Sequence, residues 1–230
     1  MPVHIHPTAP LAPRALLPGD PGRALALAQL VLSEPKMFNH NRGLWGYTGT
    51  AADGEPLTIQ STGIGGPSAA IVLEELCDLG LEVAIRVGTC GALVADLALG
   101  DLVIVDAALA SDGASRALGA DGRVAADAGL VAALQEAAGA SARTGPVATS
   151  DLFYDRDPGR AAGWREASAL AVEMEAATLL RVGELRGIRV GCLLTVSDVF
   201  EPDGARHRID AEALLKAAER LGRVGADALG

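Results

Sequence analysis

Two short segments of the sequence combine an arginine with glycines close to an apolar run. Residues 19–23 (GDPGR) offer the N–H groups of a helix start and the forked Arg23 guanidinium, which together suit an anion. Residues 86–91 (RVGTCG) end an apolar run in which Arg86 is costly unless a negative charge meets it, and Thr89 adds a hydroxyl donor. An ordinary turn with a solvated arginine explains the first segment equally well. The second favours a phosphate or carboxylate site.

Carboxylates form the second group of candidate residues. Residues 172–177 (VEMEAA) place two of them around a methionine at a predicted strand-to-helix junction. Glu175 has the oxygens to accept hydrogen bonds from a vicinal diol, and Met174 can pack on the apolar face of a sugar. An acidic first helical turn, favoured by the helix dipole, is the plainer explanation. Asp198 follows a strongly apolar run, a position that suits a catalytic acid and equally a turn or cap aspartate.

Other reactive side chains give weaker signals. Cys90 has no histidine near it in sequence, so we expect a small buried residue rather than a nucleophile. Residues 63–68 (GIGGPS) carry half of a dinucleotide-binding fingerprint, and a tight turn into a helix capped by Ser68 explains them better. His4 and His6 would share one face of an extended segment, but no third ligand accompanies them, so we expect no metal site.

The composition limits the classes of ligand and of location. The net charge of −10 argues against nucleic acid, which requires a basic surface, so a small anion must be bound by a local group of arginines. No uninterrupted apolar run reaches the roughly 18 to 20 residues of a membrane helix, and the N-terminus lacks the features of a signal peptide. The 3 cysteines are too scattered for a disulfide framework. We therefore expect a cytoplasmic protein without a nucleic-acid or membrane partner.

Apolar runs and turn signals predict alternating strands and helices across residues 1–230, which we expect to form one domain. Asp53 and Gly54 mark a hairpin, and residues 111–128 are the most loop-like stretch. The alternation favours an α/β fold whose substantially parallel sheet is flanked by helices and binds ligands beyond the strand ends. The predicted strands are 14–17, 45–50, 57–62, 83–87, 101–106, 143–149, 171–173 and 189–196, and the predicted helices are 23–32, 68–78, 126–138, 176–186 and 211–228.

Seven motifs, taken in order, carry a family resemblance. They are residues 17–23 (LPGDPGR), 41–49 (NRGLWGYTG), 61–68 (STGIGGPS), 86–91 (RVGTCG), 150–154 (SDLFY), 172–177 (VEMEAA) and 195–198 (TVSD), which span nearly the whole chain. The chain resembles the hexameric purine nucleoside phosphorylase and uridine phosphorylase family, nucleoside phosphorylase family I. The resemblance implies a single-domain, three-layer α/β fold of the phosphorylase/hydrolase type, with a mixed, mostly parallel central sheet flanked by helices.

The resemblance also assigns a role to each motif. For inorganic phosphate it implies Gly19, Arg23, Arg86 and Thr89, with Arg42 supplied by a neighbouring subunit. For the ribose it implies Glu175 on the 2′ and 3′ hydroxyls, Met174 against the sugar, and a neighbour's His4 on the 5′ hydroxyl, with His6 as the alternative to His4. For the base it implies Phe153, Ser197 and Asp198. Because His4 and Arg42 would complete a neighbour's site, we expect a homohexamer built as a trimer of dimers.

The reaction implied by the resemblance is reversible phosphorolysis. Phosphate attacks C1′ while the glycosidic bond breaks through a sugar of oxocarbenium character, which gives free base and (deoxy)ribose 1-phosphate. Arg86 and the other arginines would orient the phosphate and partly neutralise it. Asp198, if it holds or shares a proton, would donate to purine N7. Phosphate is a co-substrate in this scheme, and no metal or organic cofactor is implied.

Features of the base motifs favour purines over uracil. Asp198 stands where purine enzymes of the family carry aspartate, and the Gln-x-Arg pair by which uridine enzymes read uracil is absent after residues 153–154. The alternatives are a uridine phosphorylase, a methylthioadenosine-type nucleosidase that uses water, and a non-catalytic nucleoside-binding relative. The arginines disfavour the nucleosidase, and the intact Glu175 and Asp198 disfavour the non-catalytic relative. The sequence leaves open whether Arg206 or Arg208 supports Asp198, and whether 6-amino or 6-oxo purines are preferred.

Overall fold

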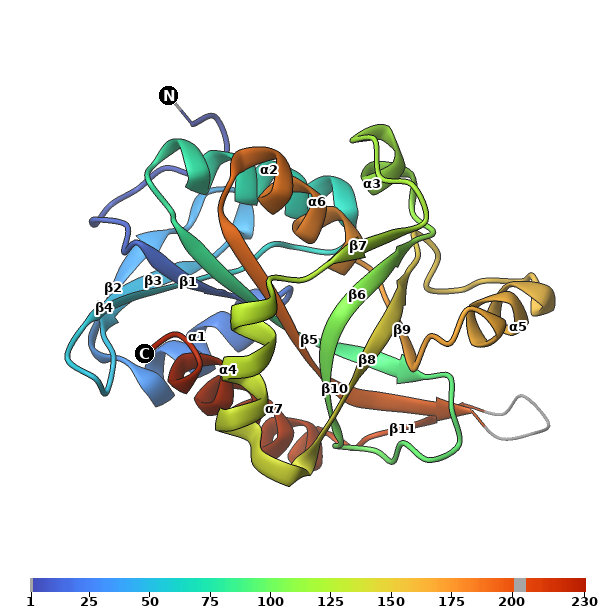
Figure 1. Cartoon of the computed structure of the whole chain (residues 1–230). Coiled ribbons are helices and arrows are strands. Elements are labelled where there is room, and N and C mark those ends of the chain that lie inside the picture. The colour runs from blue at the N-terminus through green and yellow to red at the C-terminus, as the bar shows by residue number, and fades with distance from the viewer. Residues whose placement is uncertain (1, 201–205) are drawn as a thin grey trace.

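A mixed eleven-stranded sheet runs through the part of the chain that the computed structural model describes, residues 2–200 and 206–230 (Figure 1). The strands follow the order β11-β10-β6-β8-β9-β5-β1-β4-β3-β2, with β7 beside β6. Because β10 also pairs with β5, the strands β5, β10, β6, β8 and β9 close into a ring. The strands are β1 (Arg14–Leu17), β2 (Ser33–Asn39), β3 (Gly46–Thr50), β4 (Pro56–Gln60), β5 (Val83–Ala92), β6 (Leu102–Ala110), β7 (Arg123–Ala125), β8 (Ala142–Thr149), β9 (Ala171–Glu173), β10 (Arg189–Phe200) and β11 (Arg206–Arg208).

Parallel and antiparallel pairings are almost equally frequent in this sheet. The parallel pairs are β1–β4, β1–β5, β5–β10, β6–β8 and β8–β9, which make five of the eleven pairings among the described strands. The mixed sheet is confirmed, but parallel pairing does not dominate. The antiparallel pairs include the hairpin β3–β4, whose turn contains Asp53 and Gly54, and the pair β10–β6. The parallel strands β1, β5 and β10 lie side by side at the centre.

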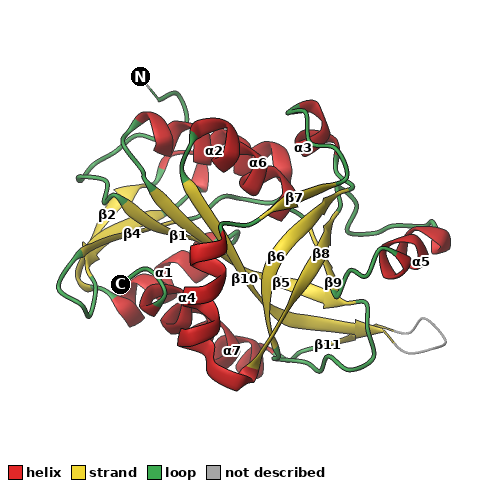
Figure 2. Ribbon diagram, in the orientation of Figure 1, coloured by secondary structure: helices red, strands yellow, loops and turns green. Residues whose placement is uncertain are grey.

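Helices cover the sheet on both faces, as expected for three layers (Figure 2). In that view α2, α3 and α6 lie on one side of the sheet, and α1, α4 and α7 lie on the other. The helices are α1 (Pro21–Val31), α2 (Gly66–Asp78), α3 (Gly113–Ala117), α4 (Ala128–Ala138), α5 (Pro158–Glu166), α6 (Ala176–Arg186) and α7 (Ala211–Asp227), with short 3-10 turns at Asn41–Gly43 and Gly139–Ser141.

The hydrophobic core is divided by the sheet into two layers. Successive residues of β1 alternate between them, because neighbouring side chains of a strand point to opposite faces. Leu17 belongs to the core layer that contains Leu73 of α2, whereas Leu16 belongs to the layer that contains Leu27 of α1. Burial on both faces explains why the central strands have no polar alternation and read as continuous apolar runs.

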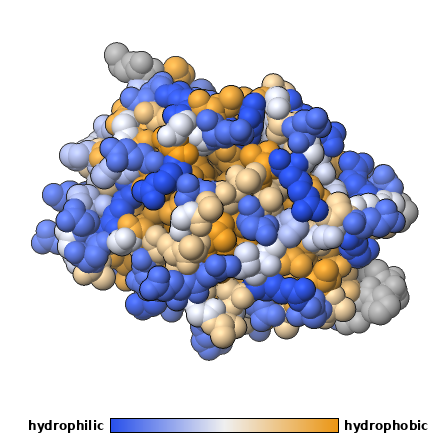
Figure 3. Space-filling model, in the orientation of Figure 1, coloured by the Kyte–Doolittle hydropathy of each residue, from blue (hydrophilic) through white to orange (hydrophobic). Residues whose placement is uncertain are grey.

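The outer surface differs from this interior. Figure 3 shows hydrophilic residues interspersed with smaller apolar patches on the face viewed in Figure 1. Within the part of the chain that the structure describes, no helix combines the length and apolar character needed to cross a membrane.

Several elements lie where the sequence pattern indicated loops. The stretch 111–128 contains α3 and β7, and Asp112 caps α3 by accepting a hydrogen bond from the Ser115 N–H at 2.8 Å. The expected strands and helices also leave out β2, α5 and β11. In β2 the first five residues are exposed, so this edge strand lacks the apolar alternation by which a strand is recognised.

Two helix starts differ from expectation. Asp20 caps α1 by accepting the Arg23 N–H at 2.7 Å, so the helix begins at Pro21 rather than at Arg23. Helix α2 begins at Gly66, with Gly65 as its cap and Pro67 in its first turn. The expected cap, Ser68, instead donates its hydroxyl to the carbonyl of Thr62 at 2.6 Å. The helix start is therefore set by the glycine backbone, and the Ser68 side chain holds the preceding loop.

Candidate active site

A cavity of about 540 Å³ lies where β5, β9 and β10 end. The chain segments that line it come from the loop before α1, the 3-10 turn after β2, and the loops that follow β4, β8 and β9. Apart from His4, every site residue expected from the sequence lines this one cavity: Gly19, Arg23, Arg42, Arg86, Thr89, Phe153, Met174, Glu175, Ser197 and Asp198. Gly63 and Ile64 of the third motif also line it, so the fold brings together residues from all seven motifs, separated by up to 179 positions, between Gly19 and Asp198.

The long strands β5 and β10 carry the floor of the cavity. Residues 88–91 lie beyond the predicted strand end at residue 87, but they continue β5 because they pair in parallel with β10. The pairing shifts register between Val196 and Asp198, which is a bulge in β10. Bulges re-aim side chains next to functional sites. Here the irregularity falls at Ser197 and Asp198, both of which line the cavity.

Arg86 is a buried cation whose charge is balanced inside the protein. Its Nε lies 3.0 Å from a carboxylate oxygen of Glu173, and its Nη2 lies 2.5 Å from one of Glu175. Burial lowers the pKa of the guanidinium, but Glu175 and Glu173 outweigh this effect and raise it above its ordinary value. Among the described residues, Nη1 of Arg86 has no hydrogen-bond partner. A fixed cation with a spare donor on a cavity wall fits an anionic ligand.

Gly88 makes room for this guanidinium. A Cβ added at Gly88 would lie 2.8 Å from Cζ and Nη2 of Arg86, which no side chain tolerates without a shift. The glycine two residues after Arg86 therefore allows the side chain to fold back along its own strand.

Glu173 holds several donors in place at the strand-to-helix junction. Its carboxylate accepts the Thr149 hydroxyl at 2.6 Å, the Glu175 N–H at 2.8 Å and the Ala176 N–H at 2.9 Å, in addition to Arg86. Burial raises the pKa of this carboxyl group, while the Arg86 charge acts in the opposite direction. Glu173 therefore ties together β8, β9, the start of α6 and the cation of β5.

Glu175 lies between this network and a glycine loop. One of its oxygens accepts the Gly65 N–H at 2.5 Å, and the other meets Arg86. Gly65 has a φ of 86°, in the left-handed region that glycine enters without strain, so the loop can direct its N–H to the carboxylate. A carboxylate offers about four lone-pair positions. Glu175 therefore keeps acceptor capacity for further donors.

The other two arginines expected at the phosphate, Arg23 and Arg42, differ in burial: Arg23 is partly buried and Arg42 is exposed. Burial lowers the pKa of Arg23, Asp20 opposes this, and the nearby charges of Arg86 and Arg208 lower it further. Arg42 is exposed and has a φ of 57°, an uncommon backbone conformation outside glycine. Arg42 lines the cavity of its own chain, so it reaches that cavity without a neighbouring subunit.

The opposite end of the cavity is built around Asp198. Its oxygens accept the Ser197 hydroxyl at 2.6 Å, Nε of Arg206 at 2.8 Å and Nη1 of Arg208 at 3.4 Å. Burial raises the pKa of this carboxyl group, but the hydrogen bonds and the arginine charges outweigh it, so the pKa lies below its ordinary value. Both arginines left open by the sequence thus contact Asp198, and Arg206 is the nearer.

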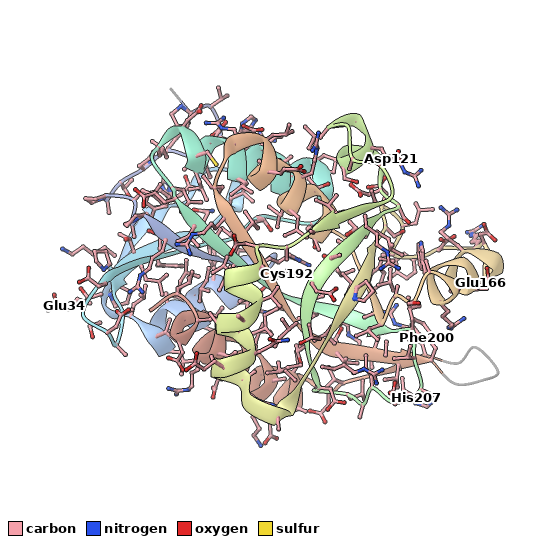
Figure 4. All side chains as sticks on the ribbon, viewed as in Figure 1. Glu34, Asp121, Glu166, Cys192, Phe200 and His207 are labelled. Atoms are coloured by element: carbon pink, nitrogen blue, oxygen red, sulfur yellow. The ribbon has the colours of Figure 1, made fainter. Side chains whose placement is uncertain are left out.

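Aromatic rings complete this end. The Arg206 guanidinium carbon lies 4.3 Å from the centre of the Phe153 ring, and Tyr154 meets that ring edge-on. Figure 4 shows Phe200 at the end of β10, close to β11. The cavity is lined by Phe153, Phe200 and Arg206. Tyr154 is not among its lining residues, and its side chain is exposed.

The family model of the phosphorylase superfamily matches residues 13–229. The chain belongs to this superfamily. Among curated relatives it is 38% identical to the guanosine phosphorylase of Halorubrum lacusprofundi over 188 residues, which cover 79% of this chain and 76% of the relative. It is 38% identical over 205 residues to the DeoD-type purine nucleoside phosphorylase of Geobacillus kaustophilus, covering 86% of each chain. It is 37% identical over 194 residues to the corresponding protein of Clostridium perfringens, covering 82% of each.

His4 is not among the residues that line the cavity of its own chain. Its Nδ1 is 2.7 Å from Glu75 of α2, whose carboxylate also accepts the N–H groups of Val3, His4 and Ile5. His6 instead places Nε2 3.1 Å from the Val3 carbonyl. The N-terminal segment is therefore fixed to α2, and the two imidazole rings have different hydrogen-bond partners.

Cys90 is a buried residue, as expected. It lies on β5 and is 3% exposed, and burial raises the pKa of its thiol far above the ordinary value. Cys192 of the adjacent β10 is also buried, near the middle of the sheet (Figure 4). A thiol that stays protonated is a poor nucleophile.

Sequence reasoning gave no role to several residues that the structure places at the site. Glu173 is the most important, because it contacts Arg86 directly. The VEMEAA motif contains Glu173 in addition to Glu175, which is the sequence feature that could have indicated it. Only the pairing of β9 with β5 shows that Glu173 faces Arg86. Further side chains lining the cavity are Leu44, Ile64, Ser150, Leu152, Val172 and Phe200. Ile64 is 80% exposed although apolar, an arrangement that a glycine turn permits and a sequence pattern does not reveal.

Proposed function

We propose that this member of the phosphorylase superfamily is a purine nucleoside phosphorylase. It converts (deoxy)ribonucleosides and inorganic phosphate reversibly into free base and (deoxy)ribose 1-phosphate. One observation carries the proposal: buried Arg86, with an unpartnered Nη1, shares a cavity and an ion pair with Glu175. An anion site and a diol acceptor side by side are what joining phosphate to a sugar requires. The names of the relatives support the same activity.

The phosphate end is formed by Arg86, Arg23 and Arg42 together with Gly19 and Thr89. In the proposed reaction these groups orient the phosphate toward C1′ and partly neutralise it, so catalysis here is positioning and electrostatics. Arg86 contributes most to the fixed geometry, because the two carboxylates hold its guanidinium in one plane. Phosphate is the co-substrate, and the scheme uses no metal and no organic cofactor.

The sugar lies between the phosphate end and the base end. Glu175 accepts the 2′ and 3′ hydroxyls with its remaining lone pairs, and Met174 packs against the ribose. Both residues line the cavity next to Arg86. The carboxylate also favours the positive charge that develops on the sugar as the glycosidic bond breaks.

The base end uses Phe153 as an apolar wall and Ser197 and Asp198 as polar groups. In the proposed reaction Asp198 helps the base to leave by donating a proton to N7. The pKa of Asp198 is lowered in the free protein, so the carboxyl group is ionised at neutral pH and must gain or share a proton in the complex.

We further propose that the chain acts as a cytoplasmic homohexamer in nucleotide salvage, arranged as a trimer of dimers. His4 supports an assembly, because it is outside the cavity of its own chain and can serve a sugar only in an adjoining subunit. Arg42 lies on the exposed rim, where it can serve its own site or a neighbour's.

A base-release assay tests the activity. Inosine, guanosine, adenosine, methylthioadenosine and uridine are each incubated with the protein, with and without inorganic phosphate. We expect purine nucleosides to be cleaved only when phosphate is present, with pentose 1-phosphate as the second product. Equal cleavage without phosphate would identify a nucleosidase, and a preference for uridine would identify a uridine phosphorylase. Binding of nucleosides without turnover would identify a non-catalytic relative.

A further inference from the structure

The turn that carries Arg42 has an unusual backbone. Arg42 has a φ of 57° and a ψ of 18°, and Gly43 follows with a φ of 70°, so two successive residues are left-handed. Glycine enters this region without strain, whereas arginine does so at a cost in free energy. A strained conformation persists only where the surrounding structure imposes it. The contacts around the turn between β2 and β3 therefore show what imposes it.

Asn39, the last residue of β2, holds the turn from within the protein. Its side chain is fully buried. Its Nδ2 donates to the carbonyl of Leu44 at 2.5 Å, and its Oδ1 accepts the N–H groups of His6 at 2.9 Å and Asn41 at 3.4 Å. These contacts use both the donor and the acceptor of the carboxamide, and a carboxylate of the same size has no donor. Asn39 thus connects both ends of the turn.

Two further carboxamides act on the same turn. Gln60 of β4 is also buried, and its Nε2 donates to the Leu44 carbonyl at 2.9 Å. Asn41 donates its Nδ2 to the carbonyl of His4 at 2.9 Å, and His4 is itself fixed to Glu75 of α2. The turn is therefore tied to β4 on one side and, through the N-terminal segment, to α2 on the other.

These contacts hold a cation at the rim of the cavity. Arg42 is exposed, and it lines the cavity together with Gly43 and Leu44. A long, flexible side chain loses conformational freedom when it binds a ligand, and a fixed starting geometry reduces that loss. A backbone held by three carboxamides limits the directions in which the Arg42 guanidinium can point.

We propose that Asn39 is a positioning residue of the phosphate site. It holds the left-handed turn so that Arg42 is directed at the phosphate, and Asn41 supports it by anchoring the turn to the N-terminal segment. This inference rests on the proposed phosphorolysis, in which Arg42 binds phosphate. Neither asparagine is among the residues that line the cavity, so both act through Arg42.

The variants Asn39→Ala and Asn41→Ala test this role in steady-state kinetics. We expect Asn39→Ala to raise KM for phosphate about tenfold, because a displaced binding group loses its orientation, and to change kcat and KM for the nucleoside less. Asn41 is only partly buried, so Asn41→Ala serves as the test if Asn39→Ala does not fold. It removes one side-chain hydrogen bond of the turn and raises KM for phosphate about 3- to 5-fold.

Thr8→Val is the matched control. The Thr8 hydroxyl donates to the Met37 carbonyl at 2.8 Å, so this variant also removes a link between the N-terminal segment and β2, but one outside the turn. Thr8→Val leaves KM for phosphate at the value of the wild-type protein. A rise equal to that in Asn41→Ala would overturn the inference, since any loosening of the N-terminal segment would then have the same effect.

A double-mutant cycle with Arg42→Gln separates positioning from a purely structural role. If the asparagines act through Arg42, Asn39→Ala and Asn41→Ala raise KM for phosphate little further once Arg42→Gln is present. Effects that multiply independently would overturn the inference. An unchanged KM for phosphate in Arg42→Gln would also overturn it, while phosphate-dependent cleavage would leave the proposed function intact.

Binding of inorganic phosphate in the absence of a nucleoside gives a readout that does not require turnover. In calorimetry we expect the asparagine variants to bind phosphate more weakly by about the factor by which KM rises. Equal affinities in the wild-type protein and both variants would overturn the inference. Weaker phosphate binding in the variants, without cleavage of any nucleoside by the wild-type protein, would contradict the proposed function and support the positioning role.

Discussion

Arg86 and Glu173 show how a charge is kept inside this protein. Both side chains are buried, and Nε of Arg86 lies 3.0 Å from a carboxylate oxygen of Glu173. The same carboxylate also accepts hydrogen bonds from backbone N–H groups and from the Thr149 hydroxyl. Removal of one partner from a buried ion pair leaves an uncompensated charge. We therefore regard Glu173 as a positioning residue that acts on the phosphate through Arg86 and on the sugar through the backbone of Glu175.

The variant Glu173→Gln tests this role. It keeps the shape and removes the charge that holds Nε of Arg86. We expect KM for phosphate to rise about tenfold or more, and KM for the nucleoside to rise less, because Arg86 is contacted directly and Glu175 only through its N–H. Steady-state kinetics with each substrate varied in turn provide the measurement.

The control for this variant is Thr149→Val, which removes another contact of Glu173 without touching Arg86. It lowers the midpoint of thermal unfolding but leaves the ratio of the two KM values near that of the wild-type protein. If both variants changed the ratio equally, Glu173 would have a structural role only.

Many of the residues that line the cavity were predictable from the sequence, because segments with unusual combinations of glycine and charge stand out from the rest of the chain. Arg86 is the clearest example, since a cation in an apolar strand requires a counter-charge. The partner of that cation was not predictable. Glu173 is 87 residues away from Arg86, and the two meet only because β9 pairs with β5. The pairing of Arg206 with Phe153 depends in the same way on β11 returning along β10.

The start of helix α6 supplies N–H groups that Glu173 accepts, and Glu175 directly precedes this helix. The packing of α6 on β10 requires a glycine. A Cβ at Gly183 would lie 2.4 Å from Cγ2 and 3.1 Å from Cβ of buried Val190. Val190 is β-branched and cannot easily rotate away. The close approach of α6 to the sheet therefore depends on the missing side chain.

Gly183→Ala is expected to destabilise the fold by about 1–3 kcal/mol through overpacking, despite the higher helix propensity of alanine. Gly163→Ala in α5 is the matched change, because a Cβ there meets nothing within 4 Å. That variant gains up to about 1 kcal/mol from helix propensity. Urea unfolding of both variants measures the difference, and a gain of stability in both would show that α6 can move outward at no cost.

Some helices and strands were easier to predict from the sequence than others. Central strands such as β1 and β10 were recognisable because burial on both faces leaves a continuous apolar run. The ends of β5 and β10 were underestimated, because glycine and polar residues there look like loop until their pairing is known. The edge strand β2 and the short helix α5 carry few buried residues, so no periodicity marks them.

Glu75 of α2 holds the N-terminal segment of the chain against the rest of the molecule. Three backbone N–H groups and Nδ1 of His4 converge on this carboxylate. Burial raises its pKa, but the hydrogen bonds from Ile5, His4 and Val3 outweigh that effect and lower it from 4.5 to about 2. A lowered pKa in the folded state means that the unfolded chain binds the proton more readily.

The stability of the protein should therefore depend on pH through Glu75. Its contribution is complete above pH 4.5 and is lost as the pH falls from there toward 2. Glu75→Gln removes part of this dependence, so its unfolding free energy falls less steeply than that of the wild-type protein across this window. Denaturant unfolding at pH 6, pH 4.5 and pH 3 provides the comparison, with Glu136→Gln, an exposed change on α4, as the control. Parallel pH profiles of the wild-type protein and Glu75→Gln would contradict the assignment.

Assembly is the property of the whole molecule on which the proposed sugar site depends. If His4 serves a neighbouring site, co-expressed His4→Ala and Glu175→Ala subunits should be more active than the two variants measured separately. Sites with an intact Glu175 then receive an intact His4 from the other variant. The control pairs His4→Ala with the double variant His4→Ala/Glu175→Ala, which supplies neither group. A lack of recovery in mixed oligomers, verified by native mass spectrometry, would show that His4 acts elsewhere.

The ion pair between Arg86 and Glu175 has a thermodynamic consequence. Bound phosphate changes the affinity of the site at Glu175 for a sugar by some factor. Bound sugar must change the affinity of the site at Arg86 for phosphate by the same factor, because coupling between two ligands is reciprocal. In the proposed reaction the pentose 1-phosphate carries both groups on one molecule and engages the pair in a single binding event. Such a bivalent ligand avoids the second association cost that two separate molecules bear. The sugar phosphate should consequently be a strong product inhibitor and a good substrate for nucleoside synthesis.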